Sequence, residues 1–122
     1  MECPKCYGDM ETVLEEGVTI DRCRNCHGLY FDQLTQEMLP DLMDKGALDS
    51  GSDEMGSAYD EMVYVECPKC DKIMDQRLLE EPVRIRFELC PTCYATFLDA
   101  GELREYLSGP FLPHFTSLLP TR

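Results

Sequence analysis

Eight cysteines are the residues of this chain best suited to carry chemistry, and each has a partner cysteine with two residues between them. Such a pair fits one tight turn that points both sulfurs inward, and two turns surround a soft divalent cation such as Zn²⁺ with four thiolates. Disulfide frameworks of secreted proteins seldom space every cysteine in this way. The spacing therefore predicts two zinc ions per chain, one held by Cys3, Cys6, Cys23 and Cys26, the other by Cys67, Cys70, Cys90 and Cys93.

Two other metal chemistries fit parts of this pattern. Residues 23–27 match the C-x-x-C-H string that attaches c-type haem, but that chemistry belongs with export, and Tyr94 stands in the second half where the first has His27. We therefore expect His27 to lie exposed beside the site, in reach of a sulfur. Four thiolates also bind iron in rubredoxin-type carriers, so iron is the competing ion. Neither ion would keep an open coordination position, which argues against hydrolytic catalysis.

The chain contains two copies of one pattern. The string ECPKC occurs at residues 2–6 and again at 66–70, and each copy continues after its last cysteine as C-x3-aromatic-apolar-Asp. Between the copies the sequence is rich in Gly, Ser and acidic residues without apolar periodicity, which is typical of a solvated linker. We predict a first domain at 1–44, an acidic linker at 45–62, a second domain at 63–107 and a Pro- and aromatic-rich tail at 108–122.

A β-hairpin is expected between the two cysteine pairs of each copy, since 16 residues separate them in the first copy and 19 in the second. In the first copy, apolar stretches at 12–14 and 18–20 flank a Glu-Glu-Gly turn. In the second, apolar residues alternate with Arg84, Arg86 and Glu88, the pattern of a half-buried strand with arginines on its solvent face. The hairpin would carry the second cysteine pair back to the first.

A short helix is expected after each hairpin. Asp32 and Asp99 occupy N-cap positions, Asp99 and Glu102 have capping-box spacing, and an apolar stripe begins at Leu103. Pro40 should end or kink the helix of the first copy. The expected fold is thus a small metal-stabilised α+β arrangement of two tandem zinc ribbons, each a pair of zinc knuckles with a β-hairpin and a short helix.

The size of each copy makes the metal part of the folding reaction. A copy of about 45 residues cannot bury enough apolar surface to offset its chain entropy, so a metal or covalent link is expected. Structural zinc contributes about 10–16 kcal/mol in small finger peptides. That is comparable to or larger than the whole stability of a typical domain, so metal binding and folding should be one event.

These motifs resemble the transcription-factor-IIB-type zinc finger (zf-TFIIB). The likeness rests on CPKC, a hairpin, a second C-x2-C followed by an aromatic residue and Asp, and an amphipathic helix, and it covers about residues 1–40 and 66–107. The resemblance implies two zinc ribbons and says little about activity. Tyr7 and Asp71 replace the glycine that follows CPxC in the family, so we expect Gly8 and Asp71 to supply the positive-φ positions of these knuckles.

Charge limits the partners that the chain can bind. The sequence has 24 acidic and 11 basic residues, a formal net charge of −13, and such a field repels nucleic acid. A local cluster of five basic residues in the second copy forms the one candidate surface for a transcription-related nucleic-acid-binding role: Lys69, Lys72, Arg77, Arg84 and Arg86.

No catalytic constellation is recognisable, since the sequence has no Ser-His-Asp grouping, glycine-rich phosphate loop or H-E-x-x-H motif. We expect a non-enzymatic zinc-binding protein that serves as a protein–protein interaction module of regulatory role, with an unknown partner and with self-association left open. Nucleic-acid binding and a redox role, with a rubredoxin-like iron site or a zinc thiol switch, are the alternatives. The tail is expected to dock on a partner or to pack back on the second copy.

The same sequence predicts a cytoplasmic protein without membrane association. The N-terminus carries no basic-then-apolar export segment, and no run of about 18 apolar residues occurs. Paired cysteines in a reducing compartment are more often metal-binding than disulfide-bonded.

Overall fold

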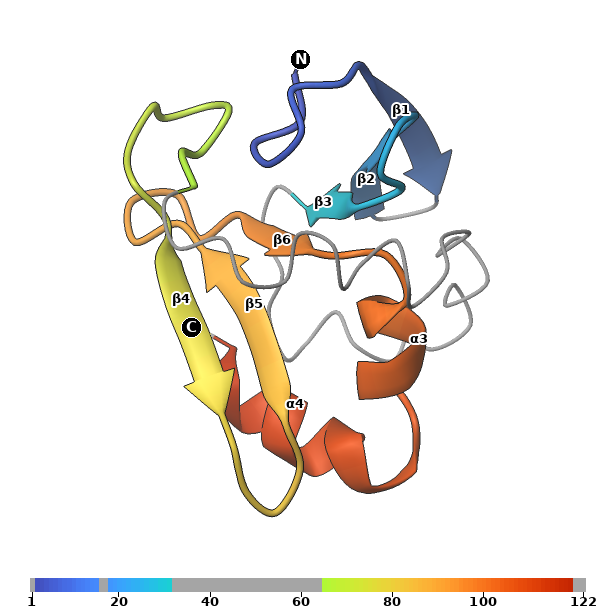
Figure 1. Ribbon diagram of the computed structural model, residues 1–122, viewed down its shortest axis with the longest axis vertical. Helices are drawn as coiled ribbons and strands as arrows, with labels where there is room; N and C mark the ends of the chain where they lie inside the picture. Colours follow the sequence, from blue (N-terminus) through green and yellow to red (C-terminus); the bar gives the residue numbers. More distant parts are fainter. Residues whose placement is uncertain (1, 16–17, 32–64, 120–122) are drawn as a thin grey trace.

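The computed structural model describes residues 2–15, 18–31 and 65–119 (Figure 1). The predicted linker, and the first-copy helix with its Asp32 N-cap and Pro40, lie outside these residues. The first copy supplies three strands: β1 (Met10–Glu15), β2 (Val18–Cys23) and β3 (Leu29–Phe31). The second supplies β4 (Asp75–Leu79), β5 (Ile85–Leu89), β6 (Thr96–Leu98) and the helix α3 (Glu102–Tyr106). The 3-10 helix η3 (Gly109–Phe111) and the helix α4 (Leu112–Leu118) follow.

The two copies share one antiparallel sheet, in the order β1-β2-β3-β6-β5-β4. The hairpins β1-β2 and β4-β5 were expected, whereas the third strand of each copy was not. These short third strands pair with each other at the centre of the sheet, with Tyr30 opposite Phe97. Figure 1 shows the two halves meeting at β3 and β6. The two copies are alike in sequence, and their strands are related by an approximate twofold symmetry within the single sheet.

Alternation along the central strands sends side chains to two different layers. Leu29 and Phe31 of β3 join an apolar core with Phe87 of β5 and the helices of the second copy. Tyr30 and Phe97 point to the opposite face and pack among the cysteines. Each strand therefore contributes to the apolar core on one side and to the cysteine layer on the other.

The expected solvent face of β5 is absent, because all five residues of the strand are buried. Arg86 is 7 % exposed and Glu88 is 1 % exposed. The backbone N–H of Arg86 donates to Tyr106 Oη at 3.1 Å, and the Glu88 side chain meets Lys5 of the first copy. The prediction that this face of β5 lies in solvent was wrong for Arg86 and for Glu88, and contact with the first copy accounts for the burial of Glu88.

The tail packs back on the second copy, one of the two arrangements that the sequence allowed. Phe115 of α4 is fully buried, and its ring meets Phe87 of β5 at a centroid distance of 5.4 Å and an interplanar angle of 80°. Tyr106 of α3 lies 5.5 Å from the same ring. The tail therefore contributes Phe115 and Leu119 to the core. Among the described residues, none of the helices has the length and apolar character needed to cross a membrane.

The helix α3 begins differently from the capping-box prediction. Its N-cap is Gly101, with φ 87° and no side-chain cap, a backbone conformation that glycine adopts at low cost. One half of the predicted box is present, because the Asp99 N–H donates to Glu102 Oε1 at 2.7 Å. The Asp99 carboxylate does not cap the helix and instead accepts a hydrogen bond from Lys5.

Candidate metal centres

The structure brings the eight cysteines together in the two predicted groups of four, and within each group the sulfurs all lie within 4.8 Å of one another. In the first group, Cys3 Sγ is 3.7 Å from Cys26 Sγ, and Cys6 Sγ is 3.3 Å from Cys23 Sγ. The corresponding distance between Cys67 and Cys93 is 3.7 Å. A tetrahedron with metal–sulfur bonds of about 2.3 Å has edges of about 3.8 Å. The spacing of the sulfurs therefore fits one small cation per group.

The pKa values of the thiols also indicate whether these sites suit a bound cation. None of the eight cysteines forms a disulfide. A hydrogen bond from Cys26 lowers the pKa of Cys3 to about 5, and the same bond raises the pKa of Cys26. In the second group, burial raises the pKa of Cys93 to about 12. Within a group, protein contacts favour ionisation of one thiol at the expense of others, so four thiolates require the charge of a bound cation.

Each of the four cysteine pairs lies in a knuckle, and the four knuckles have the same backbone conformation. The residue after each second cysteine has a left-handed backbone, with φ of 58–63° at Tyr7, His27, Asp71 and Tyr94. Its N–H donates to the carbonyl of the first cysteine in the pair, at 2.9–3.1 Å. The expectation for Asp71 is confirmed, whereas the one for Gly8 was wrong, because Tyr7 carries the positive φ. His27 is half-buried in its knuckle, less exposed than expected.

Gly8 is required for a different reason, the close approach of its backbone to the first site. A Cβ at this position would lie 2.9 Å from Asn25 Cβ and 3.3 Å from Cys23 Sγ. Opposite Gly8, the backbone N–H groups of Asn25 and Cys26 donate to Cys23 Sγ at 3.3 and 3.4 Å. Such bonds stabilise a thiolate and orient it toward the ion. The glycine thus leaves room for a sulfur that its neighbours hold in place.

Each copy also covers the knuckles of the other through its third strand. Tyr30 Oη of the first copy lies 3.4 Å from Cys67 Sγ in the second site. Burial raises the pKa of Tyr30, so the hydroxyl keeps its proton and can donate it to the thiolate. Phe97 packs over Gly28 so closely that a Cβ there would lie 2.3 Å from Phe97 Cζ. The aromatic residue is present in both copies of the sequence, but nothing in the sequence indicates that each ring contacts the opposite copy.

A buried ion pair links the copies beside the sites. Lys5 Nζ lies 2.8 Å from Asp99 Oδ2, to which it donates a hydrogen bond, and 2.8 Å from Glu88 Oε1. The side chains of all three residues are almost completely buried. Burial lowers the pKa of Lys5, but the two carboxylates outweigh it and the net shift is upward. Burial raises the pKa of Glu88 to about 7, although Lys5 opposes that shift.

Local sequence could not have identified this lysine. Lys69 occupies the same place in the second ECPKC string, and its side chain is exposed. The difference arises from contacts with the opposite copy, which the repeated string does not encode.

The donor sets are chemically consistent with zinc, which prefers a closed tetrahedron of thiolates in structural sites. Residues 2–39 match the family model described as transcription factor zinc-finger. Comparison with curated proteins and with solved structures gave no match. The family match and the two four-cysteine groups together support a zinc-binding protein. Residues 2–39 thus match the transcription-factor-IIB-type zinc finger that the motif predicted, and the second four-cysteine group suggests a second ribbon of the same kind.

Proposed function

We propose that the chain binds two zinc ions, is not an enzyme, and serves as a protein–protein interaction module of regulatory role built from two tandem zinc ribbons. The observation that carries the proposal is the convergence of four sulfurs at each centre. A tetrahedral ion with four protein ligands has no open position for water or substrate, so its role is to hold the fold. When bound, each ion would supply the charge that keeps the thiolates together.

Two exposed tyrosines, each on a knuckle, support the interaction role. Tyr7 is 71 % exposed and Tyr94 is 46 % exposed, and each directly follows a cysteine pair. Tyrosine is enriched in protein interfaces because it offers a large contact area together with a hydrogen-bonding group. Since the positive φ and the cysteines fix the backbone at these residues, little conformational entropy would be lost on binding.

The structure bears differently on the two alternative functions, nucleic-acid binding and a redox role. Nucleic-acid binding loses support from the burial of Arg86, one of the five basic residues on which it rested. The redox alternative keeps its chemical basis, because iron accepts the same four sulfurs. Protein purified from cells grown with both metals would show a visible absorption band if iron fills the sites.

Capture experiments from the native host, combined with metal analysis of the same sample, test the proposal. We expect colourless protein with two zinc ions per chain and a specific protein partner identified by mass spectrometry. The double variant Tyr7→Ala, Tyr94→Ala should keep both ions and lose the partner. Capture of nucleic acid at low salt without a protein partner, or a visible iron band, would contradict the proposal.

A further inference from the structure

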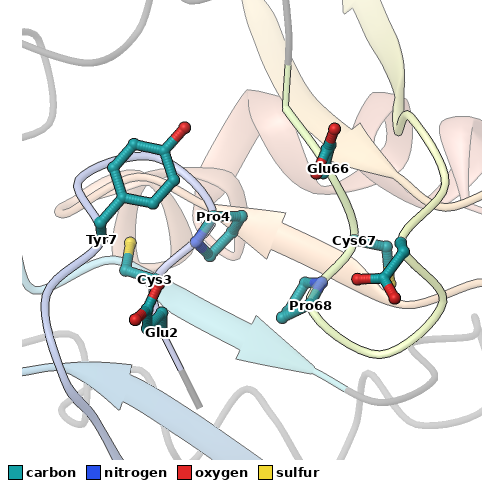
Figure 2. Close-up of a pocket in the computed structure, with 8 residues that line it drawn as sticks. Glu2, Cys3, Pro4, Tyr7, Glu66, Cys67 and Pro68 are labelled. Carbon is teal, nitrogen blue, oxygen red and sulfur yellow. The ribbon is translucent and has the colours of Figure 1, made fainter.

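A cleft of about 380 Å³ lies between the first knuckles of the two copies. Figure 2 shows the two walls, one from each copy, with Pro4 and Pro68 on opposite sides. The same four positions of each copy line it, offset by 64 residues: Glu2, Cys3, Pro4 and Tyr7 from the first, and Glu66, Cys67, Pro68 and Asp71 from the second. The cleft therefore belongs to neither copy alone and depends on their arrangement in one sheet.

The lining combines apolar walls with negative charge. The apolar part of the lining consists of the exposed ring of Tyr7, the half-buried Pro68 and the buried Pro4. Glu2, Glu66 and Asp71 supply three carboxylates, and none of the eight lining residues is basic. Cys3 and Cys67 each belong to one of the two sulfur groups, and four thiolates around a divalent cation form a dianion. Both metal centres would thus add negative potential to the same cleft.

The size and shape of the cleft limit its occupant. Small-molecule sites have volumes of about 300–1,000 Å³, so this cleft can hold one or two side chains. The carboxylates are not arranged for a metal ion, because in the described part of the chain the only groups able to hold one are the two cysteine groups. A nucleic acid would be repelled by the same potential.

We propose that this cleft binds a lysine- or arginine-containing segment of a partner protein, a proposal that rests on the interaction role described above. The cationic group pairs with the carboxylates that Glu2, Glu66 and Asp71 supply to the lining, and the aliphatic part of the side chain packs against the apolar lining. The Tyr7 ring adds a cation–π contact, which arginine makes more often than lysine. Charge complementarity selects this occupant, because the cleft and the whole chain are negative.

Chemical-shift mapping on the full, zinc-loaded, ¹⁵N-labelled chain tests the proposal with a defined probe. The probe is a capped hexapeptide of alternating glycine and arginine, and its comparator has citrulline in place of arginine, which keeps the shape and removes the charge. We expect the arginine peptide to shift amides at residues 2–7 and 66–71 and the citrulline peptide to have little effect. Equal binding of both peptides, or shifts confined to other surfaces, would overturn the proposal.

Matched variants separate the cleft from the net charge of the chain. Glu2→Gln with Glu66→Gln should weaken the arginine peptide about tenfold, as expected for the loss of two partly exposed ion pairs. Glu80→Gln with Glu81→Gln changes net charge equally at two exposed residues of the β4–β5 turn, and should change affinity less than about twofold. If both double variants weaken binding of the peptide equally, only the net charge of the chain matters, and the proposal that the cleft is the binding site is refuted.

A second pair of variants tests the aromatic contact without a change of charge. Tyr7→Leu should weaken the arginine peptide, and Tyr94→Leu should not, since Tyr94 does not line the cleft. The zinc content of each variant shows that the sites remain intact. If the peptide fails to bind while partner capture succeeds, the cleft proposal is refuted and the interaction role stands. If both fail, the interaction role falls as well.

Discussion

Replacing Lys5 with methionine should destabilise the protein strongly, whereas the same replacement at Lys69 should have little effect. Both lysines occupy the fourth position of an ECPKC string. Lys5 is buried between Glu88 and Asp99 of the other copy, while Lys69 is exposed. Methionine keeps an aliphatic chain of similar length, so the substitution at Lys5 mainly removes the charge that two buried carboxylates share.

The expected size of the effect follows from the burial of the ion pair. Removing one partner of a buried pair costs about 3–5 kcal/mol, because the remaining charge loses its compensation. An exposed lysine contributes less than about 1 kcal/mol. The pKa of Glu88 is about 7 in the presence of Lys5, which holds it down. Without Lys5 the pKa of Glu88 should rise further, so this carboxyl will be neutral over a wider range of pH.

The pH dependence then has a defined sign. A carboxyl whose pKa is raised in the folded state contributes stability below its unfolded pKa and loses it as pH rises through the folded value. The defect of Lys5→Met should therefore be larger near about pH 8.5 than near about pH 6, where protonation of Glu88 relieves part of it.

Urea unfolding of reduced, zinc-saturated protein, followed by circular dichroism, measures these differences for the wild type and both variants. A Lys5→Met variant within about 0.5 kcal/mol of Lys69→Met would refute the role assigned to the buried pair. A larger defect near the lower pH would refute the electrostatic explanation.

Three further substitutions test separate parts of the structure. Tyr30→Phe removes the hydroxyl beside Cys67 and should speed metal transfer from the second site to a chromophoric chelator about tenfold; equal acceleration at both sites would show that the contact is not specific. Gly8→Ala places a Cβ 2.9 Å from Asn25 Cβ, so the first site should lose its ion at chelator concentrations that leave the second loaded, which metal analysis detects. Phe115→Ala should cost about 3–5 kcal/mol in urea unfolding, as for other large-to-small changes in a core, and should leave the zinc content unchanged; loss of metal would mean that α4 also supports the sites.

Local spacing was sufficient to predict the two sulfur groups, because two residues between cysteines determine how a tight turn directs their side chains. The hairpins could be predicted for a similar reason, since alternation and turn residues are properties of short stretches. The left-handed residue of the first knuckle was misassigned to Gly8, because glycine is the usual choice at such positions. Here the same turn imposes that conformation on Tyr7, and Gly8 is needed for space.

Contacts between the copies could not be predicted in this way. The string ECPKC is identical in both copies, yet only Lys5 is buried, and Asp99 binds this lysine instead of capping its own helix. Glu88, which alternation placed on the solvent face of its strand, is buried because it meets the same lysine. These contacts join the two copies, whose strands β3 and β6 pair although they lie far apart in the sequence.

We expect the fold to depend on its ions, and chelation under reducing conditions tests this dependence. Titration of the loaded chain with a strong zinc chelator can be followed at once by released metal and by circular dichroism. We expect two zinc ions per chain to be released and the native spectrum to be lost as they leave. Complete removal of both ions with the native spectrum unchanged would contradict this expectation.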